Sequence, residues 1–486
     1  MNRDILSVTN PVSGKKIASL DISTNEDIIQ ISKESKKYLE WSSLSLNKRC
    51  NYINIFRKNL VKNRQNIIDV LKSETEKKDF DILIELFSTL DHLKEISKIA
   101  RRVLRPSRRG TGIMKNKKAY VLYEPMGTIG IISPWNYPLA TPINATVEAL
   151  LAGNNVVLKP SEYTPLTPLL IKKIWDECIG YSDAFKIIIG KGSQGQILVD
   201  SPNISMICFT GSTKVGREIA KKCSENFKPV ILELGGKDPM IVLKDANMKR
   251  ALESALFAGY SNAGQTCISV EEVFVEECVF DDFVNMISSR VESMSSGSDD
   301  KNEIGAMIME QNAIKVKEHI AEIKESAKVV SGSTDSHLRY IPPTLIINPP
   351  DNSRVVNEET FGPVISIRKF NNDRELLDMI HKTGYGLSAS IFGHNKKRIK
   401  GILSKLKIGN VSINDVFTHY GIASLPFGGE GFSGMGRMHG KEGLRALSRI
   451  KSVVENKFNK IADPWWYSRP KFIEKFLKKA IRLLYK

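Results

Sequence analysis

The side chains best suited to chemistry in this chain are one cysteine and one glutamate. Cys267 lies in a small, polar segment, residues 262–269 (NAGQTCIS). Because its neighbours are small, we expect the thiol to be accessible rather than packed in a core. Glu233 begins a second unusual segment, residues 233–237 (ELGGK), and offers a carboxylate base. A thiolate nucleophile with a separate base indicates covalent catalysis in which a second residue resolves the intermediate.

An amide between two prolines is the next candidate. Residues 124–138 read EPMGTIGIISPWNYP, a buried-strand pattern that runs into a loop. The prolines fix the backbone around Asn136, and the flanking aromatic residues shield its amide from water. A rigid, desolvated NH₂ group suits the stabilisation of an oxyanion. The alternative is a structural turn with packed aromatic rings.

Two glycine-rich segments could bind a nucleotide. Residues 209–216 (FTGSTKVG) follow a predicted strand and lead into a predicted helix over 216–222. Free N–H groups and the helix dipole at that point suit a pyrophosphate. Residues 190–195 (GKGSQG) fit the pattern G-x-G-x-x-G, which also arises by chance, and the acidic residue expected about 20 positions on is not clearly placed. For each segment an ordinary tight turn between strand and helix is the alternative.

Lys159 and Glu162 follow a predicted strand over residues 155–158, in the segment KPSE. Ligands bind outside the carboxyl ends of strands in open α/β sheets. A lysine and a carboxylate there suit ribose hydroxyls. The alternative is a loop punctuated by proline, with Ser161 as a cap.

Composition indicates a globular protein of two or three domains. The chain has 486 residues, of which 41% are hydrophobic and 26% charged. No apolar run reaches 18 residues and the start lacks an apolar signal, so we expect a cytoplasmic protein. Six scattered cysteines without a C-x-x-C pair predict neither disulfides nor a metal site. The net charge is +17, but the sequence contains no nucleic-acid-binding motif, so no nucleic acid partner is predicted.

The order of predicted elements indicates an α/β fold. Residues 24–105 contain neither Gly nor Pro and are typical of helices. From about residue 119, short β-branched runs alternate with helical stretches, which predicts a parallel sheet. A second α/β region begins after Gly236 with a strand over 239–243 and continues to about residue 430. Segments near 111–124 and 447–456 are expected to pair as strands outside the main body. The strands predicted for the first sheet cover residues 127–132, 155–158, 185–189, 204–209 and 230–232.

Taken together, seven motifs resemble the aldehyde dehydrogenase superfamily over roughly residues 5–460. They are PWNYP (134–138), KPSE (159–162), FTGSTKVG (209–216), ELGGK (233–237), GQTC (264–267), ETFGP (359–363) and PFGG (426–429). The resemblance implies a Rossmann-like cofactor domain, an α/β catalytic domain and a small β oligomerisation extension. The implied boundaries are 1–107 with 126–235 for the cofactor domain, 236–430 for the catalytic domain, 108–125 with 440–458 for the extension, and 463–486 for a tail.

The resemblance also implies a role for each matching residue. Cys267 matches the nucleophile, Glu233 the base that activates water, and Asn136 the side-chain donor to the oxyanion. The backbone N–H of Cys267 is the second donor. Residues 190–195 then fall in a loop bordering the adenosine cleft and rank below residues 211–216. The cofactor contacts carried over are Ser133, Trp135, Lys159, Glu162, Gly211, Ser212, Gly216, Glu359 and Phe361.

The implied reaction is the NAD(P)-dependent oxidation of an aldehyde to a carboxylic acid through a thiohemiacetal and a thioester on Cys267. Glu233 favours hydrolysis over transfer to coenzyme A. Glu162 favours NAD, with NADP as the alternative, because a carboxylate repels a 2′-phosphate. A homodimer or homotetramer is expected. The alternatives are a semialdehyde dehydrogenase with a carboxylated substrate and a catalytically silent binding protein, which the intact Cys267, Glu233 and Asn136 argue against.

The end of the chain departs from the family pattern. In residues 471–486 apolar side chains recur four apart, and the formal charge is +5 (6 minus 1). Three aromatic residues, at 465–467, precede this stretch. The pattern predicts a basic amphipathic helix. Three roles are open for this helix. It attaches to an anionic membrane surface, it forms a lid over the entry for hydrophobic aldehydes, or it packs on the chain's own oligomer.

The remaining cysteines and histidines carry no signature of chemistry. Cys208 ends an apolar strand and is expected in the core. His419 and His439 lie in regions that could approach the substrate funnel or the cofactor domain, and packing or surface roles are expected for both.

Overall fold

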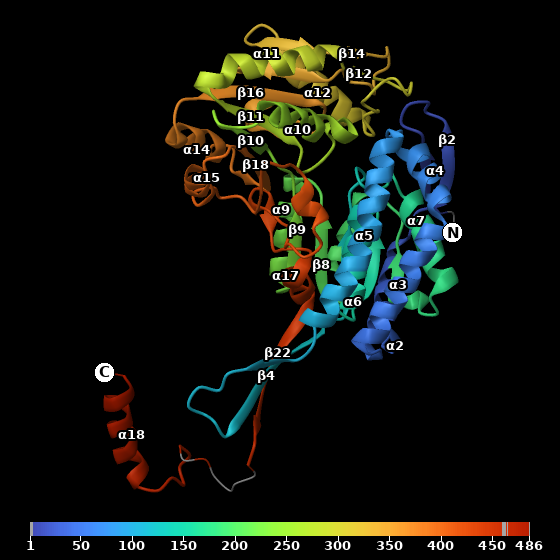
Figure 1. Cartoon of the computed structure of the whole chain (residues 1–486). Helices are drawn as coiled ribbons and strands as arrows, with labels where there is room; N and C mark the ends of the chain where they lie inside the picture. Colours follow the sequence, from blue (N-terminus) through green and yellow to red (C-terminus); the bar gives the residue numbers. More distant parts are fainter. Residues whose placement is uncertain (1–2, 459–462, 464, 486) are drawn as a thin grey trace. The chain divides into compact units, whose positions relative to one another are not determined.

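The computed structural model describes residues 3–458, 463 and 465–485 (Figure 1). The chain divides into two compact units. The larger comprises Met1–Leu104 and Glu124–Arg449, and the smaller comprises Arg105–Tyr123 and Ile450–Lys486.

The larger unit begins with an antiparallel hairpin, which the sequence did not predict, followed by the expected helices. Thr24 and Asp27 form a capping box at the first helix, and Ser45 caps the third, which explains where these helices begin. The elements are β1 (Ile5–Thr9), β2 (Lys16–Asp21), α1 (Asn25–Lys37), α2 (Glu40–Ser43), α3 (Leu46–Lys62), α4 (Arg64–Thr75) and α5 (Asp79–Val103).

The first α/β layer is a six-stranded sheet of order β21-β9-β8-β5-β6-β7. Strands β5 to β9 are parallel, as predicted, and β21 is antiparallel to β9. The predicted helix over 216–222 begins earlier, at Thr213, because Ser212 caps it. The strands are β5 (Thr128–Ile132), β6 (Asn155–Lys159), β7 (Phe185–Ile187), β8 (Met206–Thr210), β9 (Val230–Glu233) and β21 (Gly434–Met435), and the helices are α6 (Ala140–Leu151), α7 (Leu166–Cys178), α8 (Gly192–Asp200) and α9 (Thr213–Glu225).

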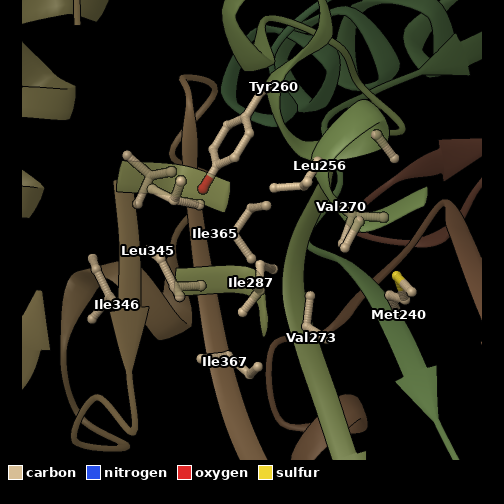
Figure 2. Packing of buried hydrophobic residues seen from close by; sticks show 14 of the residues in the cluster. Met240, Leu256, Tyr260, Val270, Val273, Ile287, Leu345, Ile346, Ile365 and Ile367 are labelled. Atoms are coloured by element: carbon tan, nitrogen blue, oxygen red, sulfur yellow. The ribbon is translucent and has the colours of Figure 1, made fainter. Parts of the chain in front are cut away.

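The second layer is a seven-stranded sheet of order β13-β15-β16-β11-β10-β18-β19, parallel except for β13. Figure 2 shows its core, in which Tyr260 lies among aliphatic side chains and donates from its hydroxyl to the Thr344 carbonyl oxygen at 3.1 Å. The strands are β10 (Asp238–Val242), β11 (Val270–Glu276), β13 (Lys328–Ser331), β15 (Thr344–Ile347), β16 (Val364–Phe370), β18 (Ser388–Phe392) and β19 (Asn410–Ile413), and the helices are α10 (Met248–Tyr260), α11 (Glu277–Ser293), α12 (Glu310–Ile323), α14 (Asp373–His381) and α15 (Lys396–Leu403).

A three-stranded sheet of order β22-β4-β3 forms the expected extension. Its strands are β3 (Ser107–Arg109), β4 (Lys117–Pro125) and β22 (Ser448–Asn456). The expectation of strand from residue 440 was wrong, because α17 (Gly440–Ala446) occupies that segment. Leu444 is fully buried there, and Arg445 donates to the Val103 carbonyl oxygen at the end of α5.

The tail forms the predicted helix, α18 (Phe472–Leu484). Across the part of the chain that the structure describes, no helix is both long and apolar enough to cross a membrane.

A buried ion pair connects the helical region to the loop that carries Asn136. Lys77 and Glu85 pair at 2.6 Å with almost no exposure to solvent. Glu85 also accepts from the backbone N–H groups of Leu139 and Ala140, at 2.9 and 3.1 Å, where α6 begins. The Lys77 ammonium lies 4.2 Å from the centre of the Tyr137 ring. This cluster therefore fixes the backbone directly after Asn136.

Glu85→Ala should lower the free energy of unfolding by about 3–5 kcal/mol, because it leaves the Lys77 ammonium buried without its carboxylate partner. Denaturant unfolding measures the change. The control on the same helix is Glu95→Ala, which removes an exposed pair with Lys98 and should have little effect. Equal unfolding of the two variants would contradict the role given to Glu85.

Candidate active site and cofactor cleft

Loops from both sheets border one cavity of about 1160 Å³ in the larger unit. It is bordered by the ends of β5, β6, β8 and β9 and by the loop that carries Cys267. Residues 192 and 195 of the glycine-rich loop also border it. Among the predicted site residues, those that line it are Ser133, Trp135, Asn136, Lys159, Glu162, Gly211, Ser212, Glu233, Cys267, Glu359 and Phe361.

Gly216 is the exception, because it does not line the cavity as described. It lies in the first turns of α9, where an added Cβ would lie 2.5 Å from Leu234 Cδ2. The absence of a side chain lets α9 approach the segment that follows Glu233. This packing accounts for a glycine at position 216, and its expected place near the pyrophosphate stays a prediction.

The loop that carries Cys267 has an unusual backbone. Asn262, Ala263 and Gly264 all have positive φ, between 53° and 68°. Gln265 is fully buried and holds this turn, since its amide donates to the Asn262 and Ala306 carbonyl oxygens and accepts from the Ile308 N–H. Strain of this kind persists only where the surroundings impose it, and it gathers at functional sites.

The Cys267 thiol is partly exposed to the cavity. Burial raises the pKa of this thiol, the carboxylates of Asp238 and Glu233 add to the effect, and its own backbone N–H opposes it. No helix begins at Cys267, because the preceding turn ends at Gly264 and β11 begins at Val270. The thiolate therefore requires another positive charge in the cleft.

Asn136 is buried and lies against the same loop. Its Nδ2 donates to the Gln265 carbonyl oxygen at 2.9 Å, and its own carbonyl oxygen accepts from Asn262 Nδ2 at 3.1 Å. Beside it, the Tyr137 hydroxyl and Thr266 Oγ1 lie 2.7 Å apart. Since one Nδ2 hydrogen is directed at Gln265, the second remains for a group in the cavity.

Glu233 ends β9 and faces the cavity with a buried carboxyl group. Neither of its oxygens has a hydrogen-bond partner among the residues that the structure describes. Burial raises the pKa of Glu233 well above its ordinary value, Arg437 opposes this rise and Glu148 adds to it. A carboxyl group with a raised pKa is suited to proton transfer near neutral pH.

The other end of the cleft fits a dinucleotide. Lys159 Nζ and Glu162 Oε2 lie 3.1 Å apart, and burial lowers the pKa of Lys159. Ser133 Oγ is buried and has no hydrogen-bond partner in the described parts of the chain. Ser212 Oγ accepts from the Val215 N–H at the start of α9. The remaining N–H groups of this first turn suit a phosphate. The donors and acceptors present therefore suit ribose hydroxyls and a pyrophosphate.

Two residues that sequence reasoning missed hold the segment with Glu359 and Phe361. Glu271 accepts from the backbone N–H groups of Thr360 and Phe361, and it pairs with the buried Lys237 at 2.6 Å. Phe361 has a φ of +57° and packs edge-on against Trp135, with ring centres 5.6 Å apart. Burial raises the pKa of Glu359 to about 7, Glu271 adds to this, and the Gly236 N–H opposes it. The signal in the sequence that could have pointed to Glu271 is a glutamate within the apolar run that forms β11.

Cys208 is buried, as expected of a core residue, and His439 is buried, as a packing role implies; both also border the cavity. His439 and His92 both contact Glu148 Oε1, at 2.6 and 2.8 Å, in a buried cluster. Although burial opposes it, the two histidines hold the pKa of Glu148 down, to about 2. His419 is buried against Ser412, as a packing role implies.

The fold and cleft define a class: a dinucleotide-binding α/β protein with a cysteine in the same cavity. The family model described as "Aldehyde dehydrogenase family" matches residues 2–453. A provisionally named NADP(+) succinate-semialdehyde dehydrogenase of Mycolicibacterium smegmatis is 32% identical over 461 residues, 93% of this chain and 89% of that protein. A 4,4'-diapolycopene aldehyde oxidase of Methylomonas is 30% identical over 466 residues, 95% of this chain and 88% of that protein.

Among solved structures, betaine aldehyde dehydrogenase of Staphylococcus aureus in complex with NAD+ matches with a TM-score of 0.88 and 27% identity, covering 96% of this chain and 94% of that chain. The chain therefore belongs to the aldehyde dehydrogenase family. It is an NAD(P)-dependent enzyme that oxidises aldehydes.

Gly264→Ala should lower kcat/KM on the order of 10²-fold, because misplacement of a reacting group by about 1 Å has that effect. An added Cβ would lie 2.1 Å from the Gly362 carbonyl oxygen, so the loop must move away from residues 359–363. The control is Gly401→Ala in α15, where a Cβ meets nothing within 4 Å. That variant should keep full activity and gain about 0.5–1 kcal/mol of stability. Full activity of Gly264→Ala would show that the close backbone approach is unnecessary.

Proposed function

We propose that the enzyme oxidises apolar aldehydes to carboxylic acids by covalent catalysis at Cys267 and hydrolysis with Glu233 as the base. The Cys267 sulfur adds to the aldehyde carbon, and the oxyanion that forms accepts hydrogen bonds from Asn136 Nδ2 and the Cys267 backbone N–H. When bound, NAD(P)+ supplies a cationic nicotinamide ring that accepts the hydride. Glu233 then removes a proton from water, which attacks the thioester and releases the acid and the thiol.

The unpaired carboxyl group of Glu233 carries this proposal. A buried carboxylate without hydrogen bonds is unfavourable, so its presence needs a compensating function. Glu233 and Cys267 line one cavity, and the Glu233 charge contributes to the raised pKa of the thiol. A water molecule beside Glu233 is thus within the same enclosure as an acyl group on Cys267.

The wall around Cys267 supports an apolar substrate. Cys267, Phe417 and Tyr420 pack against a small core of Ile268, Leu387 and Phe427. Phe257 and Val416 also line the cavity there.

A carboxylated substrate favours a cation near its distal end. In the lining that the structure describes, the lysines are Lys159 on β6, Lys221 and Lys222 on α9, and Lys315 on α12. Lys315 donates to the Glu359 carbonyl oxygen and so belongs with the segment 359–361. None of these four lysines belongs to the apolar wall around Cys267 described above, which supports an apolar aldehyde over a carboxylated semialdehyde as the substrate.

An exposed apolar stripe on α5 also supports this substrate class. Phe80, Leu83, Ile84 and Phe87 follow the spacing of one helix face, and Phe87 is 75% exposed. Ile84 lines the cavity as well. The stripe therefore continues the apolar wall outward to the surface, where an apolar chain can be held.

We also propose a homo-oligomer formed through the extension. β22 is an edge strand of its sheet, and Ile450 and Val454 are more than half exposed on it. An edge strand presents free backbone groups to a second chain.

Glu233→Gln should produce a single burst of NAD(P)H equal to the enzyme concentration, followed by slow turnover, because the thioester accumulates. Stopped-flow absorbance measures the burst. In the wild type, slow hydrolysis at low pH should speed up as pH rises through the raised pKa of Glu233, since only the ionised form accepts a proton. Glu253→Gln on α10 is the control. Normal steady-state turnover of Glu233→Gln would remove Glu233 from the mechanism.

For straight-chain aldehydes, kcat/KM should increase about fourfold for each added CH₂ group until the cavity is filled, as burial of about 0.8 kcal/mol per group implies. NAD(P)H absorbance against a chain-length series measures this. Succinate semialdehyde is included as the carboxylated comparison. A higher kcat/KM for succinate semialdehyde than for the apolar series would reject the proposed substrate class while leaving the hydrolytic mechanism intact.

A further inference from the structure

Helix α18 lies near the C-terminal end of the chain (Figure 1). Its sequence places apolar and cationic side chains on two separate faces. At about 100° per residue, the apolar side chains fall within roughly half of the circumference. They are Phe472, Ile473, Phe476, Leu477, Ala480, Ile481, Leu483 and Leu484. The other half carries one acid, Glu474, and the cations Lys471, Lys475, Lys478, Lys479 and Arg482.

Within the described residues of the smaller unit, nothing covers the apolar face of α18. None of the helix's residues is buried, and Phe476 and Ile481 are 63% and 60% exposed. The aromatic side chains of Trp465, Trp466 and Tyr467, before the helix, are exposed too. A continuous apolar surface of this kind marks an interaction site.

The start of the tail is held within the smaller unit. Asp463 is buried, pairs with Lys117 Nζ at 2.5 Å and accepts from Asn116 Nδ2 at 3.0 Å. The Lys117 ammonium also lies 5.4 Å from the centre of the Trp465 ring. These contacts attach the aromatic segment to β4 while its rings stay exposed.

The charges select the partner. The cations border the apolar face, and the one acid, Glu474, is paired with Arg469 at 3.1 Å. A second copy of this helix would bring like charges together along the rim of its apolar face, without the acidic residues that helix pairs use to compensate. Anionic lipid head groups compensate these cations, while the acyl region accepts the apolar face.

We propose that α18 and the aromatic segment before it bind the surface of an anionic membrane, with the helix in the plane of the interface. Thirteen residues are too short to cross a bilayer, which needs about 20. Tryptophan and tyrosine rings suit the head-group level. Binding there places the enzyme where apolar aldehydes dissolve, and this consequence alone rests on the proposed substrate class.

The test is co-sedimentation of the full chain with vesicles of equal parts phosphatidylcholine and phosphatidylglycerol. Wild type should bind these vesicles and not pure phosphatidylcholine, and binding should weaken between about 0.05 and 0.5 M salt. Phe476→Asp should reduce the bound fraction at least tenfold, and so should Lys478→Glu with Lys479→Glu.

Matched controls on the larger unit make the same chemical changes. Phe227→Asp alters another exposed phenylalanine, and Lys396→Glu with Lys397→Glu reverses two exposed charges at the start of α15. Both should bind vesicles like the wild type. Oxidation of a short, water-soluble aldehyde should be equal in all variants, so a failure of membrane binding is separable from a failure of the proposed function.

Two results would overturn the proposal. The first is equal sedimentation of wild type and the α18 variants. The second is a lower solution mass for Phe476→Asp by light scattering, together with no vesicle binding by the wild type. That second result would show that another copy of the chain covers the apolar face.

Discussion

The cleft depends on the contact between the loop that carries Asn136 and the loop that carries Cys267. Three hydrogen bonds, from Asn136 and Asn262 to main-chain oxygens and between Tyr137 and Thr266, connect two segments far apart in sequence. Gly264 adds a close backbone approach to Gly362 on a third segment. Because all three segments border the cavity, a shift in any one displaces the thiol from the amide that faces it.

Burial of acidic groups sets the electrostatics of this cleft. Burial raises the pKa of both Glu233 and Glu359, and the Cys267 thiol responds in the same direction. Charged forms are disfavoured where water is removed without compensation. A cationic ring beside the sulfur would therefore favour the thiolate, which links nucleophile strength to cofactor binding. The free N–H groups at the start of α9 and the Lys159–Glu162 pair suit the rest of that cofactor.

Much of the fold was predictable where local chemistry decides the structure. The stretch 24–105 forms helices because it lacks Gly and Pro and begins with a capping box at Thr24. The β-branched runs form parallel strands because they are buried on both faces. Prediction failed at residues 440–446, where burial of Leu444 against the rest of the unit selects a helix. Nor did the sequence show that Gly216 packs against Leu234, because that contact is set by tertiary packing.

By itself, the sequence determined which residues could act: a cysteine among small neighbours, a carboxylate, a proline-flanked amide and glycine-rich turns. It also determined the two faces of α18, because helical periodicity is a local property. Only the tertiary structure decided that these groups share one cavity, that Glu233 lacks a hydrogen-bond partner in the described chain, and that Glu271 and Lys237 support Phe361. The reason is physical: desolvation and hydrogen bonding depend on which distant segments pack around a group, and residue order alone does not state this.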